Sequence, residues 1–357
     1  MAPVDIVVIG SYIQDLVWTC EEFPVVGATL VGSHRTGHGG KGSNQAIGAC
    51  RASKDASRVL FCGCVGDDTP GRAVQALYKE EGGQCSVQMV PTRPTGSAGI
   101  WVDSHGSNMI IIDKGANLET DWETVYAANR DALDRASLFL FQSELEADKL
   151  RTIVKKASEC PGTVLWNPAP YMGGLSDLLP HCDIVAPNEN EFVQLYNESQ
   201  AGVSPPLTVD VIVSCTAEEM HKYCSVLGVR TVIVTLGKHG CHVSVFPKDT
   251  EGAEASNLYT RVPALSGVTA VDTTGAGDAF IGGFAACFVE TASSDASSDT
   301  AWYERVVEAA RFGCVTAGLQ VQLPGTAQAM PTRHRIEAER ERQRADLTLQ
   351  GEREREA

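Results

Sequence analysis

Short apolar runs alternate with helix-like segments along most of this chain of 357 residues. The runs are often followed by glycine and polar residues, and they lie at residues 4–9, 59–65, 138–141, 164–166, 183–186 and 231–235. Continuous apolar strands separated by helices are typical of a mostly parallel sheet that helices cover on both faces. The sequence therefore predicts an α/β fold with a ligand site at the carboxyl edge of the strands.

Two stretches, Thr19–Thr36 and Ser97–Ile112, break this alternation with short strand-like runs separated by turn residues. We expect a small separate sheet here, with its strands within residues 12–38 and 96–114. A projecting sheet with apolar residues on both faces suits a lid, a contact between two copies of the chain, or both. Residues 198–207 and 291–300 are rich in turn-forming residues and are expected to be surface loops.

The remaining pattern predicts one domain over residues 1–331, followed by a charged tail over residues 332–357. The tail has few apolar positions, so we expect a solvated helix or a disordered end and assign it no function.

The chain is acidic, with 29 Lys and Arg against 45 Asp and Glu and a formal net charge of −16. This charge disfavours nucleic acid and anionic membranes as partners. We find no apolar run long enough for a transmembrane helix, and Met1–Gly10 does not resemble a signal peptide. The twelve cysteines are expected to be reduced thiols, several of them buried, which predicts a cytoplasmic protein.

The segment from Val271 to Phe280 predicts a loop or strand that leads into a helix with phenylalanines at every fourth position. Gly275-Ala276-Gly277 then lies at a helix N-terminus, where backbone N–H groups and the helix dipole favour an anion. Asp278 in the first turn would face the same space and could take a proton from an attacking hydroxyl. Taken alone, the motif favours an ordinary helix-capping Asp behind a glycine turn, which is common.

The segment Gly37–Ala46 also leads glycines into a helix, and it is not a phosphate-binding loop of the Walker A type. Lys41 and Asn44 could face a polyhydroxy ligand. Further along, Asn188 and Glu191 could order a Mg²⁺ ion with its waters, or they could form a capping box at a helix start. Residues 235–240 form a glycine-containing strand end that could contact a nucleotide or could be a simple turn.

Taken in order, these motifs resemble those of the PfkB-type carbohydrate kinases and, within that family, the ribokinases, over about residues 5–331. The motifs are Gly10-Ser11 with Asp15, residues 39–46, residues 167–170, residues 187–189, residues 235–237 and residues 272–278. The resemblance implies a Rossmann-like α/β/α sandwich of the ribokinase type with a small β-sheet lid, often also a homodimer contact. It implies phosphorylation of D-ribose at O5 by ATP with Mg²⁺, and activation by a monovalent cation, usually K⁺.

The resemblance also implies roles for individual residues. Asp278 would be the base, and the anion hole would be formed by Gly275, Ala276 and Gly277. The sugar would be held by Ile13, Asp15, Gly40, Lys41, Gly42, Ser43, Asn44, Glu144 and Asp278. ATP would contact Asn188, Thr235, Leu236, Gly237, Lys238, His239, Gly240, Gly277 and Cys314. Mg²⁺ would be organised through water by Asn188 and Glu191. The monovalent cation would contact Asp272, Ala329 and the backbone carbonyls of Thr274, Gln320, Leu323 and Gly325.

This sequence departs from the ribokinase pattern at a few positions. Ile13 replaces an Asn that binds the sugar, Ala28 replaces an acid, Cys314 replaces a residue that flanks adenine, and Ala329 replaces a Ser at the cation site. Alternatives are therefore a kinase of 2-deoxyribose, fructose or adenosine, or a catalytically silent sugar-binding protein on the same fold. A nucleotide-dependent oxidoreductase is disfavoured because no glycine fingerprint follows the first strand.

Overall fold

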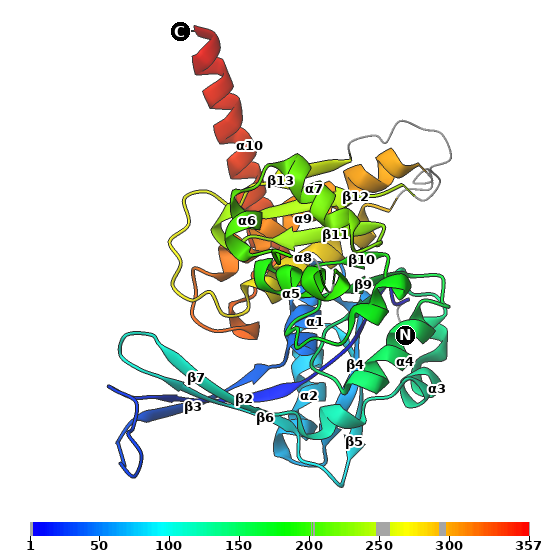
Figure 1. The fold of residues 1–357 in the computed structure, drawn as a ribbon. Helices are drawn as coiled ribbons and strands as arrows, with labels where there is room; N and C mark the ends of the chain where they lie inside the picture. The colour runs from blue at the N-terminus through cyan, green and yellow to red at the C-terminus, as the bar shows by residue number, and fades with distance from the viewer. Residues whose placement is uncertain (1–2, 201, 203, 248–257, 293–297, 357) are drawn as a thin grey trace.

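The computed structural model describes residues 3–200, 202, 204–247, 258–292 and 298–356, and its centre is a nine-stranded sheet (Figure 1). The strand order across this sheet is β13-β12-β11-β10-β9-β8-β1-β4-β5. Neighbours from β5 to β11 pair in parallel, whereas β12 is antiparallel to both of its neighbours. The bounds are β1 Ile6–Ile9, β4 Val59–Gly66, β5 Gln84–Val90, β8 Leu138–Phe141, β9 Thr163–Trp166, β10 Ile184–Val185, β11 Thr231–Thr235, β12 Cys241–Val245 and β13 Tyr259–Val262. The predicted α/β fold is confirmed.

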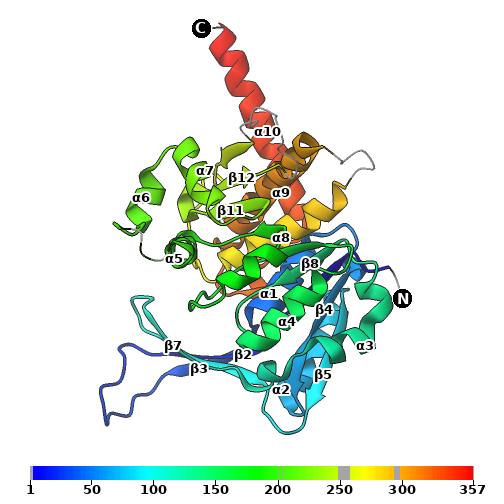
Figure 2. The same cartoon turned by 45° about the vertical axis from the view of Figure 1, so that its right-hand side comes forward.

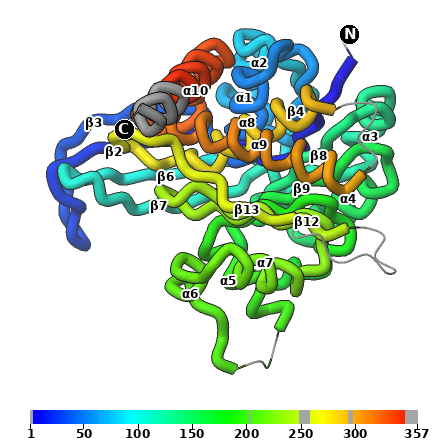
Figure 3. The backbone as a smooth tube through the Cα atoms, turned by 90° about the horizontal axis from the view of Figure 1, so that it is seen from above, coloured from blue at the N-terminus to red at the C-terminus, as the bar shows by residue number. Residues whose placement is uncertain are grey.

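Helices cover both faces of the sheet because successive side chains of a buried strand point to opposite faces. On β1, Val8 packs with the first helical layer and Val7 with the second. Figure 3 shows these two layers from above. The first layer holds α1 Lys41–Ala52, α2 Thr69–Glu80, α8 Ala276–Glu290 and α9 Asp299–Gln320. The second holds α3 Trp122–Leu133, α4 Ala147–Ala157, α5 Glu189–Ser199, α6 Val209–Ser214 and α7 Ala217–Ser225. Short 3₁₀ turns are η1 Ala56–Arg58, η2 Gly115–Glu119, η3 Ser176–His181, η4 Gly237–His239 and η5 Ala327–Ala329.

A second sheet of four strands projects from the body, as Figures 1 and 2 show. It contains β2 Ile13–Thr19, β3 Ser33–Gly39, β6 Gly96–Val102 and β7 Asn108–Asp113, in the order β3-β2-β6-β7. The separate sheet was expected. The strands lie at the expected ranges of about 12–38 and 96–114, and β2 precedes the irregular stretch that begins at Thr19. We refer to these four strands as the lid.

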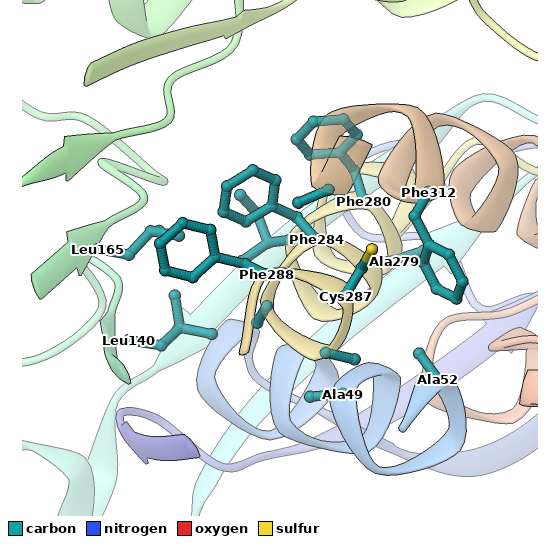
Figure 4. Packing of buried hydrophobic residues seen from close by; sticks show 14 of the residues in the cluster. Ala49, Ala52, Leu140, Leu165, Ala279, Phe280, Phe284, Cys287, Phe288 and Phe312 are labelled. Carbon is teal, nitrogen blue, oxygen red and sulfur yellow. The ribbon is translucent and has the colours of Figure 1, made fainter. Parts of the chain in front are cut away.

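Helices α1 and α8 pack against each other without large side chains at their crossing. A Cβ atom placed on Gly282 would lie 2.7 Å from the backbone nitrogen of Ala49, and one on Gly48 would lie 3.5 Å from the Cα of Gly282. Figure 4 shows the phenylalanines of α8, Phe280, Phe284 and Phe288, stacked along one side of the helix in the core. The predicted apolar stripe of this helix is confirmed.

The tail forms helix α10, Arg333–Glu356, which leaves the body at the end away from the lid (Figure 1). Its first turns are attached, because Ile336 is fully buried and Arg333 pairs with Glu290 at 2.8 Å. Of the two expected loops, residues 201, 203 and 293–297 lie outside the described part of the chain, and α5 and α9 extend into the flanking residues. Among the described helices, we find none that is long and apolar enough to cross a membrane.

The close crossing of α1 and α8 leads to a stability prediction. Gly282→Ala should lower the free energy of unfolding by about 1–3 kcal/mol, because the new methyl group meets backbone atoms of α1 that cannot rotate away. Gly48→Ala is the matched control and should change it by less than about 1 kcal/mol, since its methyl group makes ordinary contacts. Urea unfolding of both variants measures the difference, and equal effects would contradict the prediction.

Candidate active site

Helices α1 and α8 both begin at the carboxyl edge of the sheet, directly after a glycine of positive φ. Gly40 has φ 86° and precedes α1, and Gly275 has φ 81° and precedes α8. A Cβ on Gly40 would lie 2.7 Å from the backbone nitrogen of Ile13, and one on Gly42 would lie 2.5 Å from that of Ser11. Only glycine allows the start of α1 to pass this close to the chain that follows β1. Residues 40–44 are thereby placed beside the lid.

The carboxylate of Asp278 lies in the first turn of α8 and is almost fully buried, with 5% of its surface exposed. Its Oδ1 accepts a hydrogen bond from Gln45 Nε2 at 2.9 Å, and its Oδ2 accepts one from Asn44 Nδ2 at 3.1 Å. Gln45 Nε2 also donates to Asn167 Oδ1 at 2.9 Å. The start of α1 therefore orients Asp278.

Glu144 follows β8 and lies against the start of α1. Its Oε2 accepts hydrogen bonds from the hydroxyl of Ser11 and, at 2.8 Å, from the backbone nitrogen of Lys41. Among the described residues, the Oδ1 atom of Asn44 is buried without a hydrogen-bond partner. Since a buried polar atom without a partner is costly, this oxygen is available to accept a ligand hydroxyl.

Asp15 lies on β2 of the lid, paired with Ala98 on β6. Burial, reinforced by the negative charge of Glu144, raises the pKa of Asp15 to about 6. A Cβ on Gly39 would lie 2.4 Å from Oδ1 of Asp15, so a side chain at position 39 would clash with this carboxylate. Ile13, at the start of the same strand, is buried with 3% of its surface exposed.

Lys41 lies among several carboxylates. Asp278 above all, together with Glu144 and Glu191, raises the pKa of Lys41 despite its burial. Burial also raises the pKa of Glu191 to about 7. The structure thus brings residues from α1, α5, α8, the lid and the end of β8 to one place. Such a site offers many hydrogen-bond acceptors and little net positive charge, which suits a neutral ligand rich in hydroxyl groups.

The start of α5 contains the capping box that was one of the two interpretations of this motif. Asn188 Oδ1 accepts from the backbone nitrogen of Glu191 at 2.9 Å, and Glu191 Oε2 accepts from that of Asn188 at 2.9 Å. The box uses one oxygen of Glu191 and leaves Oε1 outside this contact. The effect of Asp278 and Lys41 on the pKa of Glu191 places it near the candidate base. The capping role is confirmed, and it is compatible with a metal contact through water.

The predicted nucleotide segment lies beside α5, because Asn188 forms a parallel bridge with Thr235. Leu236 is buried, whereas Gly237, Lys238 and His239 are exposed on the turn η4. Gly240 has φ 80°, and a Cβ there would lie 2.0 Å from the carbonyl oxygen of Val262. The turn therefore packs directly onto the end of β13.

Cys314 on α9 lies further along the same edge of the sheet. Its Sγ is 3.8 Å from Sγ of Cys241, the first residue of β12, and all twelve cysteines are free thiols. Cys314 borders a cavity of about 310 Å³ between the end of β13, α9 and α10. The apolar part of its lining is Val262, Pro263, Ala264, Leu265 and Val315. Since Cys241 is the register partner of Thr235, Cys314 lies near the predicted nucleotide segment, and its contact with the base stays a prediction.

The predicted anion hole lies at the N-terminus of α8, as expected. One of its expected donors has another partner, since the backbone nitrogen of Ala276 donates to the carbonyl of Thr273 at 3.2 Å. The first N–H groups of a helix have no acceptor within it, so Gly277 and Asp278 still present donors here. The expected three-residue donor set stays a prediction, in which Ala276 has an acceptor within the chain.

The residues expected to hold a monovalent cation are partly brought together, but their arrangement does not fit an ion. Gln320 Nε2 donates hydrogen bonds of 2.8 Å to the carbonyl oxygens of both Thr274 and Gly325. Those carbonyls were expected to face the cation. Ala329 is buried and offers no side-chain oxygen, only its backbone carbonyl, and Leu323 is exposed. The role expected for Gln320, a backbone carbonyl ligand, stays a prediction, and its side-chain nitrogen lies between the two carbonyl oxygens.

Three polar residues of the site were missed as site residues from the sequence. Ser11 and Gln45 stand within the quoted motifs, next to residues that were chosen, and Asn167 stands in the Asn-Pro-Ala-Pro segment. Their buried hydrogen bonds orient Glu144 and Asp278. For Gln45, the sequence signal was a polar side chain inside a helix that is otherwise expected to be buried. Buried polar groups need hydrogen-bond partners, so such a residue is a candidate for the site.

Comparison with known proteins agrees with this geometry. The profile of the pfkB family carbohydrate kinases matches residues 4–333. The ribokinase of Schizosaccharomyces pombe is 32% identical over 338 residues, which covers 92% of this chain and 95% of that protein. A ribokinase structure from Giardia lamblia has a TM-score of 0.80 at 33% identity and covers 94% of this chain and 98% of that one. The structure of Arabidopsis thaliana ribokinase complexed with ribose and ATP has a TM-score of 0.76 at 27% identity, covering 95% and 99%. The chain belongs to the pfkB family of carbohydrate kinases.

Proposed function

We propose that the chain catalyses the transfer of the γ-phosphoryl group of ATP to O5 of D-ribose. The observation that carries this proposal is the Asp278 carboxylate, oriented by Asn44 and Gln45 and placed in the first turn of α8. A carboxylate beside a helix N-terminus combines a proton acceptor with donors for the charge of a transferring phosphoryl group. The similarity to ribokinases over most of the chain supports the choice of sugar.

In the proposed reaction, Asp278 accepts the proton of the sugar 5-hydroxyl while the hydroxyl oxygen attacks the γ-phosphorus. The bond from that phosphorus to the oxygen that leaves with ADP breaks, so ribose 5-phosphate and ADP are formed. Backbone N–H groups of Gly277 and Asp278, aided by the dipole of α8, stabilise the negative charge on the transferring group. The negative charge of Asp278 raises the pKa of Lys41. Lys41 adds positive charge to this region.

The sugar would be held by acceptors from both the lid and the body. Asp15 approaches from the lid, while Glu144 and the unpartnered Oδ1 of Asn44 approach from the body. Hydrogen bonds to individual hydroxyl groups reject analogues that lack one of them. Closure of the lid would exclude water, which otherwise competes as the phosphoryl acceptor.

ATP would lie along the edge of the sheet from α8 to the cavity beside Cys314, passing the turn at residues 235–240. We place Mg²⁺ near Asn188 and Glu191, since a carboxylate oxygen and water molecules are ligands that this ion accepts. When bound, Mg²⁺ neutralises charge on the nucleotide phosphates. The twelve free cysteines favour a reducing compartment, and we propose a cytoplasmic location.

We further propose that two copies of the chain associate through the lid. Four consecutive residues of the edge strand β7, Met109 to Ile112, are between 46% and 70% exposed. An exposed apolar edge strand is a strong association site unless something covers it. A second lid offers the same apolar strand and the same free edge, so it is the partner that we favour.

The first functional prediction concerns Asp278. Wild-type protein should phosphorylate D-ribose with a higher kcat/KM than 2-deoxyribose, fructose or adenosine. Asp278→Asn should lower kcat by roughly 10²–10⁴-fold, because the base is lost while the size of the side chain is kept. Coupled-enzyme assays measure the rates, and calorimetry should find ATP binding retained.

The matched control for this variant is Asp210→Asn, which changes an exposed carboxylate on α6. It should leave the rate unchanged. Full activity of Asp278→Asn would contradict the role of the base. A higher kcat/KM for another acceptor would instead require the sugar contacts to be reassigned, beginning at Ile13.

The second prediction concerns pH. Because the pKa of Asp15 is raised to about 6, this carboxylate is ionised above pH 6 and loses its charge as the pH falls. The KM for ribose should therefore rise below pH 6, by about tenfold one pH unit below the pKa if only the ionised form accepts the sugar hydroxyls. Asp15→Asn should have a high KM that stays flat over the same range. A wild-type KM that does not change between pH 5 and pH 7 would refute this assignment.

The third prediction concerns the lid. Ile110→Asp combined with Ile111→Asp places a charge on each face of β7, because neighbouring residues of a strand point to opposite faces. Sedimentation velocity should find a dimer for the wild type and a monomer for this variant. Val211→Asp with Val213→Asp, on exposed apolar positions of α6, should remain dimeric. A monomeric wild type would disprove the contact.

A further inference from the structure

The C-terminus of α9 meets the loop that leads into α8. Backbone nitrogens of Val271 and Asp272 donate to the carbonyl of Val321 at 2.7 and 3.1 Å. Thr274 in this loop directly precedes Gly275, the N-cap of α8. Any group that fixes the Thr274 carbonyl therefore also fixes the start of α8, where the phosphoryl group is expected to react.

The side chain of Gln320 is that group. Gln320 is the last residue of α9, has no exposed surface, and lies between the loop at Thr274 and the loop at Gly325. Its single Nε2 atom donates both of its protons, one to each carbonyl oxygen, at 2.8 Å. An alkali cation that joined these loops would itself have to lie between several such oxygens, in place of its hydration shell. The amide nitrogen occupies the space between the same two oxygens.

Several neighbouring oxygens are also engaged by groups of the chain, whereas Oε1 of Gln320 itself is, among the described residues, buried without a hydrogen-bond partner. The backbone carbonyl of Gln320 accepts from Leu323 N at 3.0 Å. The Asp272 carboxylate accepts from Thr274 N and from Gly325 N, each at 2.9 Å. At position 329 the chain has a buried alanine, so a side-chain oxygen is missing there.

Negative charge near these carbonyls is compensated without an ion. The backbone N–H groups of Thr274 and Gly325 stabilise the negative charge of the Asp272 carboxylate through hydrogen bonds. The end of α9 carries the negative pole of its helix dipole. The two N–H bonds of the Gln320 amide point their positive ends at this region.

We propose that the Gln320 amide takes the place of a monovalent cation in this chain, so that the start of α8 is ordered in the absence of K⁺. Gln320 is thus a positioning residue, which acts through the Thr274 carbonyl. Its influence on catalysis rests on the proposed function, whereas its effect on ion binding does not. The opposite orientation of the amide would point Oε1 at two carbonyl oxygens and would require a cation between them.

The first test measures ribose phosphorylation at constant ionic strength in tetramethylammonium, sodium and potassium chloride. The wild-type rate should change by less than about twofold among these salts. Gln320→Ala removes the amide, so it should lose at least about tenfold in kcat without K⁺ and recover most of it with K⁺. Gln320→Glu replaces the NH₂ group by an oxygen at nearly the same size and should depend on K⁺ even more strongly.

The matched control is Gln322→Ala. The amide of Gln322 donates to the carbonyl of Gly318 at 2.8 Å, close to the same helix end but outside the two loops. This variant should behave as the wild type in every salt. Activation of the wild type by K⁺ of fivefold or more would overturn the proposal, and so would equal losses in both Gln320 variants that K⁺ does not restore.

The second test uses no catalysis. Thermal unfolding of the apoprotein, followed in potassium and in tetramethylammonium chloride, should give the same midpoint for the wild type and a higher midpoint in K⁺ for Gln320→Glu, since a ligand that binds only the folded state stabilises it. A wild-type midpoint that K⁺ raises in a saturable way would refute the proposal. If no acceptor is phosphorylated in any salt, the proposed function fails, and this measurement still decides the role of Gln320.

Discussion

The contact between α1 and α8 at Gly48 and Gly282 determines the geometry on which the rest of the site depends. Two helices can approach this closely only where neither has a side chain at the crossing, and the atoms that meet there are backbone atoms. Asn44 and Gln45 lie about one turn from the crossing on α1, and Asp278 lies one turn from it on α8. Their hydrogen bonds therefore join two elements that have no freedom to separate. The orientation of the carboxylate follows from packing in the core.

The electrostatics of the site follow from the same arrangement. Carboxylates from the lid, the end of β8, α5 and α8 converge on the start of α1, where they raise the pKa of Lys41 and, with burial, those of Asp15 and Glu191. A neutral sugar can satisfy such acceptors with its hydroxyl groups at no cost in charge repulsion. The polyanionic substrate is met by helix N-termini, where positive potential comes from backbone groups. An acidic chain can in this way bind both a sugar and a nucleotide at adjoining positions.

The sequence predicted the parallel sheet, the lid and the glycine turns before α1 and α8, because each depends on local pattern: apolar runs, turn residues and small residues at a helix start. It did not predict β12 and β13, whose antiparallel pairing at the sheet edge depends on contacts between distant segments. The pairing of Gln45 with Asp278 joins residues 233 positions apart, and no spacing rule connects them. Asn188 and Glu191 illustrate a different limit, since one local pattern supports both a cap and a metal contact. At Gln320, family resemblance pointed to the backbone carbonyl, and the two hydrogen bonds of the side chain could not be foreseen because they depend on how distant loops pack.

Gln320 also indicates how a structural ion can be replaced. A bound cation orders the loops around it only while its concentration in solution keeps the site filled. A side chain is covalently attached, so it is always present at its site, and no ion has to lose its hydration shell. The replacement must still supply donors to the same carbonyl oxygens, which an amide NH₂ group can do for two of them. It supplies no full positive charge, so the nearby acid has to be stabilised by other means. The two hydrogen bonds from backbone N–H groups to Asp272 meet that requirement.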